Sequence, residues 1–209
     1  METGQIKNII EAVLLAAGEP VTIKRLQTIF SESELNHNDI AKALQQLSED
    51  YENRGIELKE VASGFRIQTK QTIQAWVAKL WQEKPKKYTR ALLETIALIA
   101  YRQPVTRGEI EDVRGVAVSS YIIRTLLDRD WIRVLGYRDV PGKPAMFGTT
   151  KEFLDYFNLK SLQDLPTLAE IKDVDDFIPQ LNLVASANDH EQAFLAQFKN
   201  NKKINNEEE

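Results

Sequence analysis

The stretch RQPVTRGEIEDVRGV, residues 102–116, has the end signals of a short helix. Thr106 is a plausible N-cap, because its hydroxyl can accept a hydrogen bond from a free amide of the first turn. Gly115 can end the helix. The next stretch, SSYIIRTLLDRDWI at residues 119–132, has the apolar spacing of a second helix. Together the two stretches are typical of a helix-turn-helix.

A short motif from this stretch occurs twice in the chain. Residues 20–22, Pro-Val-Thr, recur as residues 104–106. Each copy follows an apolar helical stripe, and Thr22, like Thr106, is a plausible N-cap. A third helix is expected in each copy, capped by Asn38 in the first and by Ser119 or Ser120 in the second. The apolar positions that we expect to line these helices are Ile6, Ile9, Ile10, Val13, Leu14, Ala17, Ile40, Leu44, Leu47 and Tyr51 in the first copy, and Leu92, Leu93, Ile96, Ala97, Ile99, Ala100, Ile122, Ile123, Leu126 and Leu127 in the second.

Each copy ends in a candidate β-hairpin. The first, GIELKEVASGFRIQT, is expected to turn at Ser63-Gly64, and the second is expected to turn at Pro141-Gly142. Proline fixes φ and glycine permits the positive φ of a type II turn. Three helices followed by a two-stranded ribbon is the winged-helix plan. The sequence therefore predicts a mainly α fold with small β-wings: two tandem winged-helix domains followed by a flexible acidic C-terminal tail.

Four segments are predicted from composition and periodicity. Residues 1–70 form the first winged-helix domain, and residues 71–88 form a linker helix followed by a basic linker. Residues 89–157 form the second winged-helix domain. Residues 158–209 are acidic and weakly periodic, which is typical of a mostly disordered tail.

The distribution of charge argues against strong DNA binding by this chain alone. Its net charge is −4, with −3 on residues 1–70, +3 on residues 71–88, +1 on residues 89–157 and −5 on residues 158–209. The second candidate reading helix holds two arginines, Arg124 and Arg129, beside Asp128 and Asp130. Phosphate contacts require a basic surface, so protein binding is favoured over direct reading of DNA. A DNA-binding winged-helix transcription regulator remains the alternative.

The sequence contains no sign of an enzyme. It has no cysteine, and its two histidines, His37 and His190, lie in separate regions. No catalytic triad, phosphate loop or metal-ligand spacing is found, so we expect no catalytic residue, cofactor or metal. Glu109, Glu111 and Asp112 are expected to be a solvated helix face. No apolar run is long enough to cross a membrane.

Aromatic and arginine side chains are the candidates for protein contacts, because both are enriched at interfaces. On the linker helix, Trp76 and Trp81 either pack against a winged helix or anchor a partner. Lys84, Lys86 and Lys87 form either a solvated linker or a weak phosphate contact. Trp131 and Phe147 are expected in the core. The candidates on or near the second helix-turn-helix, each of which could instead be solvated surface, are Tyr101, Arg102, Arg107, Arg114, Tyr121, Arg124, Tyr137 and Arg138.

Several long stretches resemble one known family. They are EAVLLAAGEPV, ALLETIALIAYRQPVTRGEIEDVRGV, LGYRDVPGKPAMFGTTKEFLDYFNL and LQDLPTL. Over residues 1 to about 178 the chain resembles segregation and condensation protein B, ScpB, of bacterial chromosome-organising complexes. The residues after about 180 match no pattern of that family.

The resemblance implies a non-enzymatic accessory subunit that takes part in chromosome condensation and segregation during cell division. It implies a homodimer formed largely through the first winged-helix domain. It also implies binding to the kleisin subunit, segregation and condensation protein A, which bridges the heads of an SMC ATPase. DNA would be reached mainly through this complex, and the chain would lie in the cytoplasm with the nucleoid.

Overall fold

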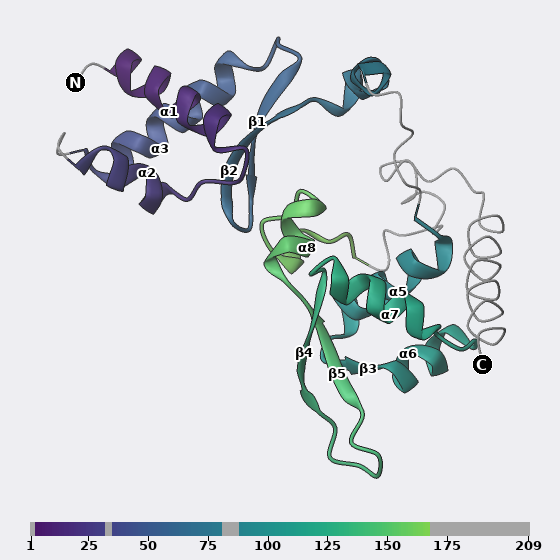
Figure 1. Cartoon of the computed structure of the whole chain (residues 1–209). Coiled ribbons are helices and arrows are strands. Elements are labelled where there is room, and N and C mark those ends of the chain that lie inside the picture. Colours follow the sequence, from purple (N-terminus) through teal and green to yellow (C-terminus); the bar gives the residue numbers. More distant parts are fainter. Residues whose placement is uncertain (1–2, 32–34, 81–87, 168–209) are drawn as a thin grey trace, which may run out of the picture.

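The computed structural model describes residues 3–31, 35–80 and 88–167. The described part is mainly helical and has two small antiparallel sheets, one of two strands and one of three. Figure 1 shows two units, each of which has its own cluster of buried side chains. We define residues 3–69 as the N-terminal unit and residues 88–167 as the C-terminal unit.

The N-terminal unit has three helices followed by a hairpin. They are α1 (Thr3–Ala17), α2 (Ile23–Ile29), α3 (His37–Asp50), β1 (Ile56–Val61) and β2 (Gly64–Thr69). The Thr22 hydroxyl accepts a hydrogen bond of 3.1 Å from the Arg25 amide, which confirms Thr22 as the cap of α2. The cap of α3 is Asn36, so the prediction of Asn38 is wrong. Asn36 and Asp39 exchange side chain–backbone hydrogen bonds, which satisfies two otherwise free amides at once.

The core of this unit lies between α1 and α3. Ile10 and Ile40 are completely buried, and Tyr51 donates a hydrogen bond of 2.7 Å from its hydroxyl to Glu11. The predicted apolar faces of both helices are buried or half-buried. The 3.6-residue spacing of apolar side chains was therefore a sufficient signal for these helices.

The C-terminal unit repeats this order and adds a helix. It contains α5 (Arg90–Arg102), β3 (Val105–Thr106), α6 (Arg107–Arg114), α7 (Ser120–Asp128), β4 (Ile132–Tyr137), β5 (Ala145–Thr149) and α8 (Lys151–Tyr156). Thr106 begins α6, and Gly115 ends it with a left-handed φ of 68°. The Ser119 hydroxyl accepts a hydrogen bond from the Tyr121 amide and begins α7. All three end signals are confirmed.

The repeated Pro-Val-Thr motif has the same structural role in both units. Val21 pairs with Phe65 of β2, and Val105 pairs with Phe147 of β5. The threonine that follows each valine caps the next helix. The motif thus joins the return strand of each hairpin to the start of the second helix of its unit.

The first hairpin turns one residue earlier than the sequence indicated. The turn is formed by Ala62 and Ser63, and Gly64 is already the first residue of β2, opposite Val61. Gly64 has φ of +132°, and a Cβ at this position would lie 2.4 Å from the carbonyl oxygen of Val21. This close approach of two backbones requires glycine. The second hairpin turns at Pro141-Gly142, as expected.

The segment after the first hairpin is less regular than the predicted linker helix. It consists of a 3-10 turn at Gln71–Ile73, α4 (Gln74–Val77) and a second 3-10 turn at Ala78–Leu80. Trp81 and the lysines at 84, 86 and 87 lie outside the described residues.

The residues after α8 extend the C-terminal unit. Leu159, Leu162 and Leu165 pack against its buried cluster, and a 3-10 turn spans Leu162–Asp164. The sequence assigned these positions to the tail, because acidic composition outweighed three leucines spaced by three residues. The rest of that predicted tail, residues 168–209, lies outside the described part of the chain.

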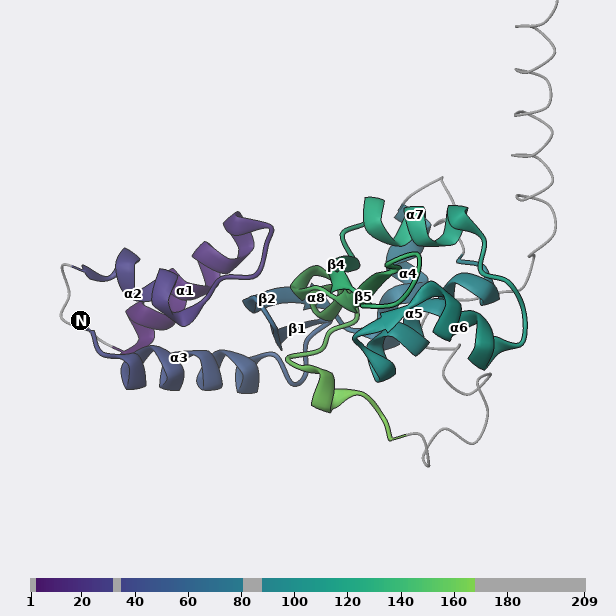
Figure 2. The same cartoon turned by 90° about the horizontal axis from the view of Figure 1, so that it is seen from below.

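In the described part of the chain, the tip of the first hairpin contacts the end of α8 in the other unit. Figures 1 and 2 both show the β1–β2 tip beside α8. The Ala62 amide donates a hydrogen bond of 3.0 Å to the Leu159 carbonyl, and the Ser63 amide donates one of 2.9 Å to the Asp155 carboxylate.

Candidate partner-binding surfaces

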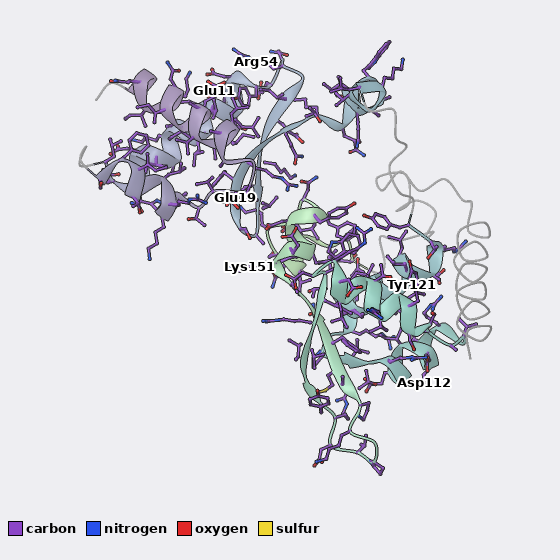
Figure 3. All side chains as sticks on the ribbon, in the orientation of Figure 1. Glu11, Glu19, Arg54, Asp112, Tyr121 and Lys151 are labelled. Atoms are coloured by element: carbon purple, nitrogen blue, oxygen red, sulfur yellow. The ribbon has the colours of Figure 1, made fainter. Side chains whose placement is uncertain are left out.

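The α7 surface, which we define as Tyr121, Arg124 and Leu127, is an exposed face of mixed chemistry. These residues are three apart along α7, so they share one side of the helix. Tyr121 is 58% exposed and the Arg124 side chain is 82% exposed. Leu127 is also exposed, which corrects the prediction that it lines the core. Figure 3 shows where Tyr121 lies on the C-terminal unit.

The buried side of the same helix fixes this surface in place. Ile122, Ile123 and Leu126 belong to the core of the C-terminal unit. Trp131 and Phe147 are buried there too, so their assignment to the core is confirmed. An exposed face carried by a helix with a well-packed opposite side is a rigid platform for a partner.

The hairpin surface, which we define as Val134, Leu135, Tyr137 and Val140, is the second exposed apolar region. All four side chains are exposed, and Tyr137 is 66% exposed. β4 lies at an edge of its three-stranded sheet, with β5 as its only partner strand in that sheet. In Figure 1 the outer half of this hairpin extends beyond the helices of the unit. The sequence pointed to Tyr137 as a contact residue but not to the three aliphatic residues, although IRVLGY lacks the polar alternation of a strand with one buried face.

A shallow, open pocket of about 420 Å³ lies near the tip of the second hairpin. Tyr137, Arg138, Asp139 and Lys143 line this pocket. Arg138 is less available than the sequence indicated, because its Nη2 donates a hydrogen bond of 2.5 Å to Glu109 of α6.

Two further candidate arginines are held by internal partners. Arg107 donates hydrogen bonds to Glu111 at 2.9 Å and to Ser120 at 3.0 Å. The Arg114 side chain is only 9% exposed, and it forms an ion pair of 3.0 Å with Glu94. The structure therefore assigns Arg114 to the interior of the unit rather than to a partner surface. Arg102 is exposed at the end of α5.

Tyr101 connects α5 to the last described residues. Its hydroxyl donates a hydrogen bond of 2.6 Å to the carbonyl of Pro166. The Tyr101 side chain is half-buried at this position. The bond gives Tyr101 an internal contact, which the sequence did not foresee because the two residues lie 65 positions apart.

Trp76 is the largest exposed aromatic side chain that the structure describes. It is 70% exposed, and Lys79 Nζ lies 4.2 Å from the centroid of its ring. Leu80 is exposed beside it in sequence. Of the two alternatives for Trp76, packing against a winged helix of the same chain is therefore wrong. Trp81 lies outside the described residues.

Two acidic residues of α6, Glu109 and Glu111, accept hydrogen bonds from other groups of the unit. Glu109 accepts a hydrogen bond of 2.8 Å from the Thr106 amide, and this bond, followed by the bond from Arg138, lowers the pKa of Glu109. The Val118 amide, followed by Arg107, lowers the pKa of Glu111 in the same way. Of the predicted acidic face, Asp112 is exposed.

The described residues hold no group of three or more histidine, aspartate or glutamate side chains that could bind a metal ion. None of the described helices has the length and apolar character needed to cross a bilayer. The α7 surface and the hairpin surface are thus exposed regions of apolar side chains with nearby charges, which suit binding to another protein.

Comparison with known proteins identifies the family. The model of a family described as segregation and condensation complex subunit ScpB matches residues 8–168. The segregation and condensation protein B homologue of Coxiella burnetii is 56% identical over 183 residues, which cover 85% of this chain and 88% of the relative. Segregation and condensation protein B of Syntrophotalea carbinolica is 41% identical over 176 residues, with 83% and 87% covered.

Two solved structures are also similar. ScpB from Mycobacterium tuberculosis is 36% identical and covers 75% of this chain and 96% of its own, with a TM-score of 0.36. A dimer of the ScpB N-terminal domain in complex with an ScpA peptide is 28% identical and covers 36% of this chain and 93% of its own, with a TM-score of 0.33. The family match over residues 8–168 and the 56% identity show that the chain belongs to the ScpB family, whose members are non-enzymatic subunits of the segregation and condensation complex.

Proposed function

We propose that the two units are tandem winged-helix domains and that both act by binding proteins. The repeated order of three helices and a hairpin supports this assignment, as does the shared role of Val21 and Val105. In this proposal residues 1–70 form a homodimer, residues 71–88 are a linker, and residues 89–157, extended to 167, bind the kleisin subunit.

The observation that carries the kleisin assignment is the exposed chemistry of the C-terminal unit. The α7 surface places apolar Tyr121 and Leu127 beside the charge of Arg124, and the hairpin surface adds four apolar side chains. An amphipathic kleisin segment could lay apolar residues on these side chains and acidic residues beside Arg124. Burial of such residues at the centre of an interface gives large binding energies.

Direct reading of DNA is the less favoured alternative. α7 carries one arginine and one aspartate, Arg124 and Asp128, so the helix brings no net positive charge to a phosphate backbone. A helix that reads DNA usually carries several cations that meet phosphates and base edges. We therefore propose that the chain reaches DNA through the kleisin and the SMC ATPase, and that it works in the cytoplasm at the nucleoid.

The homodimer is proposed to form through the N-terminal unit. Two large aliphatic side chains, Leu15 on α1 and Ile29 on α2, are exposed there. Exposed apolar groups of this kind are often covered by association. Light scattering of the full chain at tens of micromolar, a range typical of weak dimers, is the test, and a strict monomer would contradict this part of the proposal.

Co-purification with the kleisin and SMC subunits tests the function as a whole. The proposal predicts one assembly that contains all three proteins, with a mass that fixes the number of copies of each. The control is the kleisin with the segment that binds this chain deleted. If the full kleisin fails to retain the folded chain, kleisin binding is refuted.

A further inference from the structure

The two hairpins of this chain differ in what surrounds them. The second hairpin exposes its apolar side chains, whereas the tip of the first lies against α8 of the other unit. The contact combines backbone and side-chain groups. Besides the bonds from the amides of Ala62 and Ser63, Arg66 Nη2 donates hydrogen bonds to the Asp155 carbonyl at 2.8 Å and to the Asn158 side chain at 2.7 Å.

An ion pair adds to these bonds at the edge of the contact. Lys160 Nζ lies 2.6 Å from Glu60 Oε2, and the hydrogen bond that Lys160 donates to Glu60 raises the pKa of Lys160. Asp155, which accepts the bond from Ser63, is buried. A buried carboxylate needs hydrogen-bond donors, and here the N-terminal unit supplies one of them.

The groups that meet the hairpin tip belong to a well-defined helix end. The Asn158 amide donates to the Asp155 carbonyl, and the Leu159 amide donates to the Leu154 carbonyl at 2.8 Å. Asn158 has φ of 59°. These bonds are those of a Schellman motif with asparagine in the left-handed position. The motif fixes the direction of the Asp155 carbonyl, so this acceptor is positioned before Arg66 meets it.

Both sides of the contact are anchored within their own unit. At the base of the tip, Phe65 exchanges backbone hydrogen bonds of 2.8 and 2.9 Å with Val21. On the other side, Phe153 of α8 is buried in the core of the C-terminal unit. Each side of the contact is thus bonded to, or packed in, its own unit, so the contact can transmit the position of one unit to the other.

We propose that the first hairpin is an intramolecular clamp, which holds the C-terminal unit in one orientation and is therefore not available to an external partner. The clamp consists of Glu60, Ala62, Ser63 and Arg66 on the hairpin, and of Asp155, Asn158, Leu159 and Lys160 at the end of α8. Single hydrogen bonds of this type are weak, but the covalent connection between the units raises their effective concentration. In this proposal the first hairpin contacts the other unit of the same chain, whereas the second hairpin remains exposed to a partner protein.

Thiol crosslinking tests the clamp without any binding partner. The chain has no cysteine, so a pair can be introduced without background reaction. In Glu60→Cys/Lys160→Cys the new thiols replace two exposed side chains in direct contact. The matched control is Arg54→Cys/Lys160→Cys. Figure 3 places Arg54 at the end of the N-terminal unit away from α8, and the strand residues Ile56–Glu60 separate it from the contact.

A short bismaleimide should join the first pair within one chain, at least about tenfold faster than the control pair, because a clamped contact raises effective concentration. Added to the first pair, Arg66→Ala should slow the reaction by about fivefold or more, as expected for lost hydrogen bonds. Lys59→Ala, opposite Arg66 across the same hairpin, should leave the rate unchanged.

Mass spectrometry separates the outcomes. A crosslink at the mass of one chain, faster than in the control pair, supports the clamp. Equal rates in the two pairs would overturn it, as would products that join only two separate chains. An unchanged rate in Arg66→Ala would remove Arg66 from the clamp. Circular dichroism of every variant checks that both units remain folded, so a slow reaction cannot be mistaken for unfolding.

Discussion

Arg138 of the second hairpin donates a hydrogen bond of 2.5 Å to Glu109 of α6, 29 residues earlier in the chain. The same carboxylate accepts hydrogen bonds from the amide and the hydroxyl of Thr106. Glu109 therefore holds the start of α6 and the hairpin together. This relationship ties the position of the hairpin surface to the helices behind it.

Acidification should weaken this link. Because the Thr106 amide and Arg138 lower the pKa of Glu109, its folded-state pKa lies below the unfolded value of about 4.3. The contribution of Glu109 to stability is complete above that unfolded value and is lost as the pH falls through the folded pKa. We expect Glu109→Gln to lose less stability than the parent chain as the pH falls from neutral through the titration of Glu109.

Denaturant unfolding at a series of pH values measures the effect. The effect should be modest, since the Glu109 side chain is well exposed and solvent screens its charge. Asp112→Asn, which changes an exposed carboxylate on the same helix, is the control. If both variants reduce the pH dependence of the unfolding free energy equally, the cause is net charge rather than the hydrogen bonds of Glu109.

Arg114→Ala should destabilise the fold. The substitution removes a mostly buried side chain and one of the two arginines that bond to Glu94. Burial alone would raise the pKa of Glu94, but hydrogen bonds from Arg90 and Arg114 outweigh it and lower that pKa. Loss of one bond beside a half-buried carboxylate costs about 1–3 kcal/mol of unfolding free energy.

The matched change is Arg102→Ala at the exposed end of α5, which should alter stability by less than about 0.5 kcal/mol. The unfolding midpoint in urea measures both variants. Equal effects would contradict the internal role that the structure gives to Arg114.

Two glycine-to-alanine changes should have opposite signs. Gly64→Ala places a Cβ 2.4 Å from the Val21 carbonyl oxygen at a φ of +132°, so it should cost about 2 kcal/mol or more. Gly108 lies in α6 with open space around it, so Gly108→Ala should gain about 0.5–1 kcal/mol from helix propensity. Thermal unfolding, followed by circular dichroism, measures both variants. A melting temperature of Gly64→Ala equal to that of the parent chain would refute the close contact between Gly64 and the Val21 carbonyl.

Kleisin binding should depend on the two surfaces of the C-terminal unit. Arg124→Glu combined with Tyr137→Ala should weaken binding by about 2 kcal/mol or more if these residues are hot spots. Both side chains are exposed, so the melting temperature should hardly change. Isothermal titration calorimetry measures the affinity.

The control for this variant is Lys151→Glu, which makes the same charge reversal at an exposed position of α8. Because Arg124 and Tyr137 lie on different elements, the two single variants should also be measured. Unaltered affinity in the folded double variant would move the proposed site elsewhere, with exposed Trp76 as the next residue to test.

The chain alone should bind duplex DNA weakly and without sequence preference. Its net charge is −4, and α7 carries one arginine and one aspartate. Few phosphate contacts mean low affinity and a shallow dependence on salt. A fluorescence titration at physiological salt checks this, with a scrambled duplex as the control. A dissociation constant near 10⁻⁸ M, which is roughly that of specific binders, would overturn the prediction.

Local signals in the sequence were enough for most of the elements. The caps at Thr22, Thr106 and Ser119 and the end at Gly115 depend on residues within one helical turn. Asn36 was missed because asparagine occurs at both 36 and 38, and only the bond with Asp39 distinguishes them. Such reciprocal bonds are visible in the pattern N-x-x-D, a variant of the capping box.

Contacts between distant residues could not be predicted in the same way. Arg114 and Glu94 are 20 positions apart, and Tyr101 and Pro166 are 65 apart. On a helical wheel Arg114 resembles any solvated arginine, because its burial depends on how α5 and α6 pack. For the same reason the sequence assigned Arg114 and Tyr101 to a partner surface.

The first hairpin reaches α8 partly through backbone amides, those of Ala62 and Ser63. Every amino acid except proline supplies such an amide, so evolution can change these two side chains without loss of the contact. Arg66 and Asn158 meet through their side chains, and in relatives that keep the clamp we expect these two positions to change together. A relative with proline at 62 or 63 should have lost the bond, and its two halves are then free to diverge in orientation while both cores stay the same.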